Sequence, residues 1–144
     1  MIDIHKIQVG DYLQNTNGNV GRVIGVRPYM GTAPSMKYDY EVIMQYHQTW
    51  TVFSDPKILQ PIPITPEILE KNGFEKTPCG MGKTILTFSD DYSAISIDEI
   101  TDSIWRVEYM NREFSLPLCR ELICHVHELQ QFLRLCGINL EIKL

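Results

Sequence analysis

The sequence lacks several features that would point to a membrane-bound or secreted protein. No run reaches about 18 consecutive apolar residues, the length that a membrane-spanning helix requires. The stretch MIDIHKIQVGDY at residues 1–12 contains no apolar signal-peptide core. The four cysteines include no C-x-x-C pair, so free thiols are expected rather than a zinc site. These absences predict a cytoplasmic protein that does not enter a membrane and holds no metal.

Positive charge is also scarce. The net charge is −5, and residues 65–144 supply all of it, because the charges of residues 1–64 cancel. Proteins that bind nucleic acid usually present a basic face to the phosphates. Residues 65–144 are therefore poor candidates for that role, whereas a local basic patch is compatible with residues 1–64.

What the sequence does contain is an ordinary globular composition, with 44% hydrophobic and 22% charged residues. Short strands dominate residues 1–60. Asn17-Gly18 is a strong hairpin signal, and further strands are predicted at residues 38–46 and 50–53, after a His47-Gln48-Thr49 turn. Closely spaced short strands predict a small β-barrel, and the portion VGDYL…GNVGRVIGV resembles SH3-like barrels of the KOW type.

Residues 61–65 are rich in proline and predict an extended connector that divides the chain into two domains. Thr65 is a favourable N-cap for a short helix over residues 66–72, and Gly73 fits the left-handed position after the helix end. The second domain is then expected over residues 66–144.

That second domain is predicted to be α+β. Strands are expected at residues 84–89, 92–98 and 104–109, as an antiparallel meander. A helix over residues 118–136 is predicted because apolar residues recur there at helical spacing: Leu118, Leu122, Val126, Leu129, Leu133 and Cys136. The alternating tail INLEIKL predicts a final strand at residues 138–144. The expected fold is therefore α+β: a small SH3-like β-barrel, then an antiparallel meander packed by a C-terminal helix and a final strand.

Residues 77–84, TPCGMGKT, resemble part of a phosphate-binding loop. Such a loop works when a strand delivers it and a helix follows, so that backbone N–H groups converge on the phosphates. Here a short helix precedes the motif and the β-type run ILTF follows it. We therefore expect Gly80–Thr84 to form a loop that enters a strand, with no nucleotide site and no cofactor.

Two polar faces of the predicted helix have a spacing at which metal ligands converge: Glu121, His125 and Glu128 on one, and Cys124, His127, Glu128 and Gln131 on the other. Both flank the apolar stripe, so we interpret them as solvated faces stabilised by side-chain pairing. A metal-dependent hydrolase built on them is the alternative. No Ser-His-Asp, Cys-His or paired-carboxylate set stands out, so no enzyme is expected.

A set of aromatic and basic residues in the N-terminal part is the candidate binding surface: Arg22, Arg27, Tyr29, Lys37, Tyr38, Tyr40, Tyr46 and Trp50. Such residues can stack on single-stranded nucleic acid or line a groove for a peptide. The alternative is that they fill the core and rim of the barrel.

Two segments, PIPITPEILEKNGF at residues 61–74 and HVHELQQFLRLCGINLEIKL at residues 125–144, carry a resemblance to known proteins. Together they resemble a family of small uncharacterised proteins encoded by prophages and other mobile elements of Bacteroidetes. The resemblance implies a phage-related setting and no particular mechanism. The sequence thus predicts a non-enzymatic binding or adaptor protein with a protein partner. The alternative is a nucleic-acid-binding accessory protein that acts through the N-terminal barrel.

Overall fold

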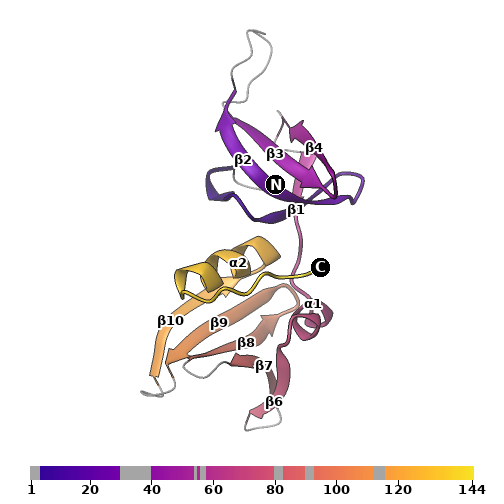
Figure 1. Ribbon diagram of the computed structural model, residues 1–144. Coiled ribbons are helices and arrows are strands. Elements are labelled where there is room, and N and C mark those ends of the chain that lie inside the picture. Colours follow the sequence, from indigo (N-terminus) through magenta and orange to yellow (C-terminus); the bar gives the residue numbers. More distant parts are fainter. Residues whose placement is uncertain are drawn as a thin grey trace. The chain divides into compact units, whose positions relative to one another are not determined.

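The computed structural model describes residues 4–29, 40–53, 55, 58–79, 83–89, 93–111 and 116–144. The chain divides into two compact units, Met1–Ile62 and Pro63–Leu144 (Figure 1). The division falls inside the connector expected at residues 61–65. Each unit contains an antiparallel sheet, and the second also contains two α-helices, so the chain is α+β as predicted. Within the described ranges, no helix has the length and apolar character needed to cross a membrane.

The sheet of the first unit has the strand order β4-β3-β2-β1-β5. A short 3-10 turn, η1, precedes these strands. The bounds are η1 Ile4–Lys6, β1 Tyr12–Asn15, β2 Val20–Pro28, β3 Tyr40–Tyr46, β4 Thr49–Phe53 and β5 Leu59–Pro61. β1 pairs with both β2 and β5, so the last strand of the unit returns to the first. Within the described residues no pairing joins β4 to β5, so the sheet is not seen to close into the predicted barrel.

Turn chemistry accounts for the β1–β2 hairpin. Gly18 has φ +79°, a left-handed conformation that glycine adopts without steric cost. The Asn15 side chain accepts hydrogen bonds from the backbone N–H groups of Asn17 at 2.9 Å and Asn19 at 3.0 Å. The register of β2 against β3 then shifts between Val23 and Gly25. A glycine such as Gly25 within a strand often marks a β-bulge of this kind.

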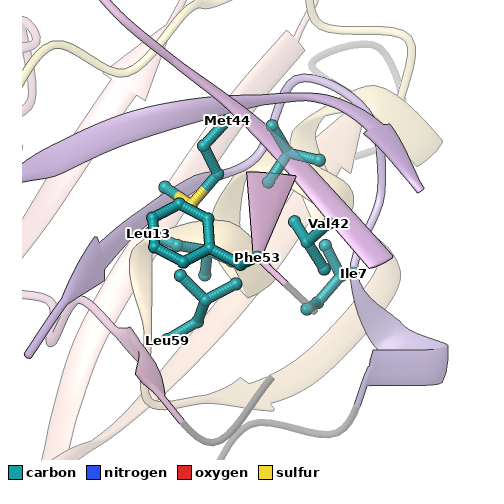
Figure 2. Packing of buried hydrophobic residues seen from close by; sticks show 7 residues of the cluster. Ile7, Leu13, Val42, Met44, Phe53 and Leu59 are labelled. Carbon is teal, nitrogen blue, oxygen red and sulfur yellow. The ribbon is translucent and has the colours of Figure 1, made fainter. Parts of the chain in front are cut away.

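One face of this sheet forms the core of the first unit. Its fully buried side chains include Leu13, Val23, Val42 and Met44, which come from three neighbouring strands. Figure 2 shows Phe53 of β4 and Leu59 of β5 lying against Leu13 and Met44. The alternation of strand side chains places every second residue of these strands, such as Gln45 and Trp50, on the opposite face.

The sheet of the second unit is a meander with the order β10-β9-β8-β7-β6. Its strands are β6 Glu75–Cys79, β7 Lys83–Ser89, β8 Ser93–Thr101, β9 Ile104–Asn111 and β10 Leu116–Ile123. The middle three confirm the predicted meander, and in β9 the side chains of Trp105 and Val107 are buried. β6 and β10 were not predicted. They extend the meander at its two edges (Figure 1).

The short helix α1, Pro66–Lys71, confirms the predicted start and end signals. The hydroxyl of Thr65 accepts a hydrogen bond from the backbone N–H of Ile68 at 3.4 Å. At the other end Gly73 has φ +85°, and the N–H of Phe74 donates to the carbonyl of Leu69 at 3.1 Å. This is the Schellman arrangement expected for a glycine after a helix end.

The long helix predicted at residues 118–136 is wrong over its first part. Residues 116–123 form strand β10, and the helix α2 spans only Val126–Leu135. Leu118 and Leu122 are 59% and 67% exposed, so they do not belong to the buried stripe, whereas Val126, Leu129 and Leu133 are buried as predicted. The apolar residues of β10 happen to continue the four-residue spacing of the apolar residues of α2, so the sequence pattern indicated one long helix.

The Glu128 side chain caps the N-terminus of the α2 helix. The Glu128 carboxylate accepts from the backbone N–H groups of Cys124 at 2.7 Å and His125 at 3.0 Å. Burial acts to raise the pKa of Glu128, but these two N–H donors and the neighbouring histidines outweigh it and lower that pKa. Glu128 therefore serves as a structural cap at this helix end.

The tail at residues 138–144 is not a strand, contrary to prediction. It still presents alternate residues inward, since Ile138 and Ile142 are buried while residues 139, 141 and 143 are exposed. No described strand pairs with it. Its backbone is held by the Asn72 side chain and by the Lys71 ammonium, which donates to the carbonyl of Leu144.

Candidate binding edge of the N-terminal sheet

Strand β4 is an edge strand with none of the usual devices against pairing. Its sequence, TWTVF, contains no charged residue and no proline. All five of its residues pair with β3 in continuous register, from Thr49 opposite Tyr46 to Phe53 opposite Val42. An uncharged edge in regular register is a template for another strand.

The other edges of the two sheets are protected. β5 is three residues long and ends in Pro61. β6 contains Pro78 beside charged residues, and β10 contains Pro117 and a register shift next to it. Short length, proline and irregular register all weaken pairing with a further strand. Among the described strands, β4 is thus the edge most open to strand addition.

The turn before β4 determines which of its backbone groups face outward. His47 and Gln48 form a two-residue turn, and His47 has φ 49°, a conformation typical of such hairpin turns. The residues that flank a two-residue turn form a hydrogen-bonded pair, and hydrogen-bonded pairs alternate along the ladder. Thr49, Thr51 and Phe53 therefore direct their N–H and C=O groups toward β3. The corresponding groups of Trp50 and Val52 point to the open side.

The outer face of the sheet, opposite the core, carries Trp50. Its side chain is 67% exposed, and the register places Gln45 and then Arg22 beside it on the neighbouring strands. A pocket of about 360 Å³ lies on this face and includes Arg22, Gln45 and His47 in its lining. Trp50 is thus an exposed aromatic anchor next to the open edge.

The inner face beside β4 is hollowed by a larger pocket of about 490 Å³. Three alternate residues of the edge strand line it, namely Thr49, Thr51 and Phe53. Tyr46 of β3 and residues of the β1–β2 hairpin complete the lining. A strand added to β4 would therefore have Trp50 on one side and this pocket on the other.

Tyr46 is held firmly within this pocket. Its ring lies edge-on to Phe53 at a centroid distance of 6.2 Å, and its hydroxyl donates to the Met44 sulfur at 3.7 Å. A Cβ at Gly21 would come within 2.8 Å of the Tyr46 ring, so glycine at this position makes room for the ring. Burial raises the pKa of Tyr46, although a hydrogen bond with Asn15 acts to lower it, so the phenol is neutral at physiological pH.

The structure separates the predicted surface residues into two groups. Arg22, Arg27 and Trp50 share the outer face, where Arg27 pairs with Glu41 at 2.8 Å. Tyr40 and Tyr46 are half-buried on the inner face, so they do not join a single stacking surface with Trp50. Tyr29 is half-buried beyond the end of β2, and Lys37 and Tyr38 lie outside the described residues.

Residues 77–79 of the phosphate-loop motif lie in β6 and residues 83–84 lie in β7, and Thr77 pairs with Ile85. A strand precedes the motif, contrary to the expected helix, but a strand and not a helix also follows it. Of the expected loop Gly80–Thr84, residues 80–82 lie outside the described part of the chain. The absence of a nucleotide site remains a prediction.

The proposed polar faces of a long helix do not exist as such, because Glu121 lies in β10. In the part of the chain that the structure describes, no group of three or more His, Cys, Asp or Glu residues is placed to hold a metal ion. His125 precedes the first turn of α2, and its Nδ1 lies 3.3 Å from the Glu128 carboxylate. These residues build the start of a helix.

Sequence reasoning missed the binding edge itself. Asn15, Thr51 and Val52 attracted no attention because each is an ordinary residue of a short strand, and Thr49, which was predicted in the turn, is the first residue of β4. One signal was available: the run TWTVF lacks the charge or proline found in or beside β5, β6 and β10. It becomes meaningful only once β4 is known to be an edge, which depends on strand order.

Comparisons with protein-family models, with curated proteins and with solved structures find no match for this chain.

Proposed function

We propose that this chain is a non-enzymatic binding module whose N-terminal unit captures an extended protein segment by strand addition to β4. The observation that best supports this proposal is the unprotected edge TWTVF, with Trp50 exposed on one side and a pocket on the other. In strand addition, main-chain hydrogen bonds supply affinity, and pockets for alternate side chains supply specificity. β4 offers both.

The order β4-β3-β2-β1-β5 also supports the proposal that this unit is a partly open SH3-like barrel. β5 returns to pair with β1, as it must for a sheet that curls toward closure. We further propose the phage or mobile-element setting, which rests on the motifs at residues 61–74 and 125–144. In that setting the chain acts as an adaptor in the cytoplasm of the host cell.

Selection of peptides from a displayed random library against the full chain tests the function. Val52→Pro removes an outward N–H while leaving the pairing of β4 with β3, because proline is tolerated where the N–H of an edge strand faces solvent. Val52→Thr keeps the N–H and serves as the matched control. We expect the selected peptides to bind the native chain and Val52→Thr and to lose most of their affinity for Val52→Pro. Thermal melting checks that both variants are folded.

Two further readouts report on the same event. Trp50 is 67% exposed while Trp105 is 3% exposed, so a shift in tryptophan emission on peptide binding reports on Trp50. The amides of Trp50 and Val52 should become protected from hydrogen exchange, whereas that of Thr51 should already be protected by β3. Peptides that bind Val52→Pro as tightly as the native chain, or a library that yields no binder, would contradict the proposal.

Nucleic-acid binding through the outer face is the second candidate, favoured by the exposure of Trp50 beside Arg22. It is less well supported because Arg27 on the same face is paired with Glu41. Phosphate contacts would make affinity for single-stranded nucleic acid fall steeply with salt. Strand addition through backbone groups predicts little salt dependence, so a salt titration distinguishes the two.

A further inference from the structure

The pocket beside β4 has a definite chemical character. Among the described residues that line it there is no Lys, Arg, Asp or Glu. Its aromatic members are Tyr46 and Phe53, whose rings meet edge-on with an interplanar angle of 63°. Asn15, Asn19 and the hydroxyls of β4 provide polar groups around these rings. The described lining therefore offers a charged side chain no carboxylate, ammonium or guanidinium as a partner.

Part of the polar lining is already fixed in place. The Asn15 carboxamide oxygen accepts hydrogen bonds from two backbone N–H groups of its own turn. The Asn15 side chain also hydrogen-bonds with Tyr46. Because Asn15 and Tyr46 are already held by these contacts, little further ordering of these two side chains is needed for a flat ring to add to the existing aromatic pair. The volume of about 490 Å³ leaves room for such a ring.

We infer that this pocket binds an uncharged aromatic side chain, carried by the segment that adds to β4. The inference rests on the proposed function and specifies its ligand. Side chains of an added strand alternate between the two faces, so the aromatic residue lies beside Thr49 and Thr51 and its sequence neighbours lie on the Trp50 side. The captured sequence thus has an aromatic residue in an otherwise extended segment.

A side-chain analogue tests the pocket without any peptide. Para-cresol, the analogue of tyrosine, is titrated into the full chain and followed by amide NMR spectra. We expect saturable shifts concentrated at Asn15, Asn19, Thr49 and Thr51. n-Butylammonium and propionate, the analogues of lysine and glutamate, should give no such shifts. Equal shifts with all three probes, or none with para-cresol, would overturn the inference.

Variants separate the pocket from the strand-addition edge. Val52→Pro should leave para-cresol binding unchanged, because it alters the outward N–H and not the pocket. Thr51→Lys, which puts a charge at the exposed lining of the pocket, should abolish para-cresol binding, while Thr51→Val should retain it. Loss of para-cresol binding in Val52→Pro, or its retention in Thr51→Lys, would contradict this assignment.

The peptides selected on the native chain give the last test. Replacing their aromatic residue with alanine should weaken binding by about tenfold or more, as truncation of an aromatic anchor usually does. If the alanine forms bind equally well, or the selected peptides share no aromatic residue, the aromatic pocket is wrong even though strand addition stands. If aromatic peptides bind Val52→Pro unchanged, strand addition is wrong and the pocket stands.

Discussion

The side chain of Asn72 pairs with both backbone groups of Lys143. The Lys143 N–H donates to Asn72 Oδ1 at 2.6 Å, and Asn72 Nδ2 donates to the Lys143 carbonyl at 2.7 Å. Because the same nitrogen also donates to the carbonyl of Ile68 at 2.7 Å, Asn72 ties the end of α1 to the C-terminal tail. Asn72 is buried, so its carboxamide has little access to water as a substitute for these partners.

Replacing Asn72 should therefore destabilise the second unit. We expect Asn72→Ala to lower the free energy of unfolding by about 1–3 kcal/mol, the range for leaving buried polar groups unpaired. Urea denaturation measures the loss. Asn139→Ala, at an exposed asparagine of the same tail, is the matched control and should have almost no effect. Equal losses in the two variants would show that the Asn72 pairing contributes nothing.

The boundary between β10 and α2 can be tested with two leucines. Leu129→Ala should cost about 2–5 kcal/mol, because Leu129 is fully buried in α2. Leu122→Ala should change the free energy of unfolding by less than about 0.5 kcal/mol, because its side chain is 67% exposed on β10. A large loss of unfolding free energy from Leu122→Ala would contradict this boundary and favour the continuous helix that the sequence pattern predicted.

Acid should weaken the start of α2 through Glu128. Its pKa in the folded state is lower than the ordinary value of 4.5, so the unfolded chain takes up the proton more readily. The stabilisation is present above 4.5 and is lost as the pH falls through the lower folded value. We expect Glu128→Gln to be less stable than the native chain at neutral pH, with the difference shrinking in acid. Urea denaturation across this range measures it, and a difference independent of pH would contradict the prediction.

Cys136 should be slow to react with alkylating reagents. Burial, together with a hydrogen bond to Cys119 and nearby negative charge, raises the pKa of Cys136 to about 11 from 9.0. A thiol so shifted carries about a hundredfold less of the reactive thiolate at neutral pH. Mass spectrometry after iodoacetamide treatment should find the exposed Cys79 modified first. In urea all four cysteines should react alike, and early modification of Cys136 in the folded chain would refute the assigned environment.

The approach of Gly21 to Tyr46 makes a prediction for the pocket beside β4. Gly21→Ala would place a Cβ within 2.8 Å of the Tyr46 ring, so we expect a loss of about 1–3 kcal/mol and a displaced ring. Gly25→Ala is the control, because its Cβ would come no nearer than 3.3 Å to the Ile43 side chain and should cost less. Thermal melting compares the two, and para-cresol binding should weaken only in Gly21→Ala.

Local chemistry made much of this fold predictable. Thr65 and Gly73 mark the ends of α1, and Asn17-Gly18 marks the first hairpin, because each acts on the backbone of its immediate neighbours. β10 escaped prediction because Leu118 and Leu122 continue the spacing of α2. Periodicity alone cannot separate a strand from a helix where apolar residues happen to fall at a helical interval.

Features that depend on distant partners were not predictable in this way. The alternation of the tail gave the burial of Ile138 and Ile142 correctly, but their segment is held by Asn72 and not by a neighbouring strand. The position of β4 at an edge follows from the order of the strands, which no residue within β4 specifies. For the same reason the sequence identified Trp50 as a candidate without indicating that it is exposed beside an open edge.

The hydrogen bonds between Asn72 and Lys143 also affect when each unit of the chain can finish folding during synthesis. The described strands of the first sheet are all present once Pro61 has been made. In the second unit, Asn72 can bond to the Lys143 backbone only after that residue, 71 positions later, has been synthesised. Likewise, the β-bridge of Pro63 can form only after His125 has been synthesised. Contacts so distant in sequence form slowly. While the ribosome is still translating the last residues, the β4 edge can therefore already be in place, and the second unit is the later of the two to be completed.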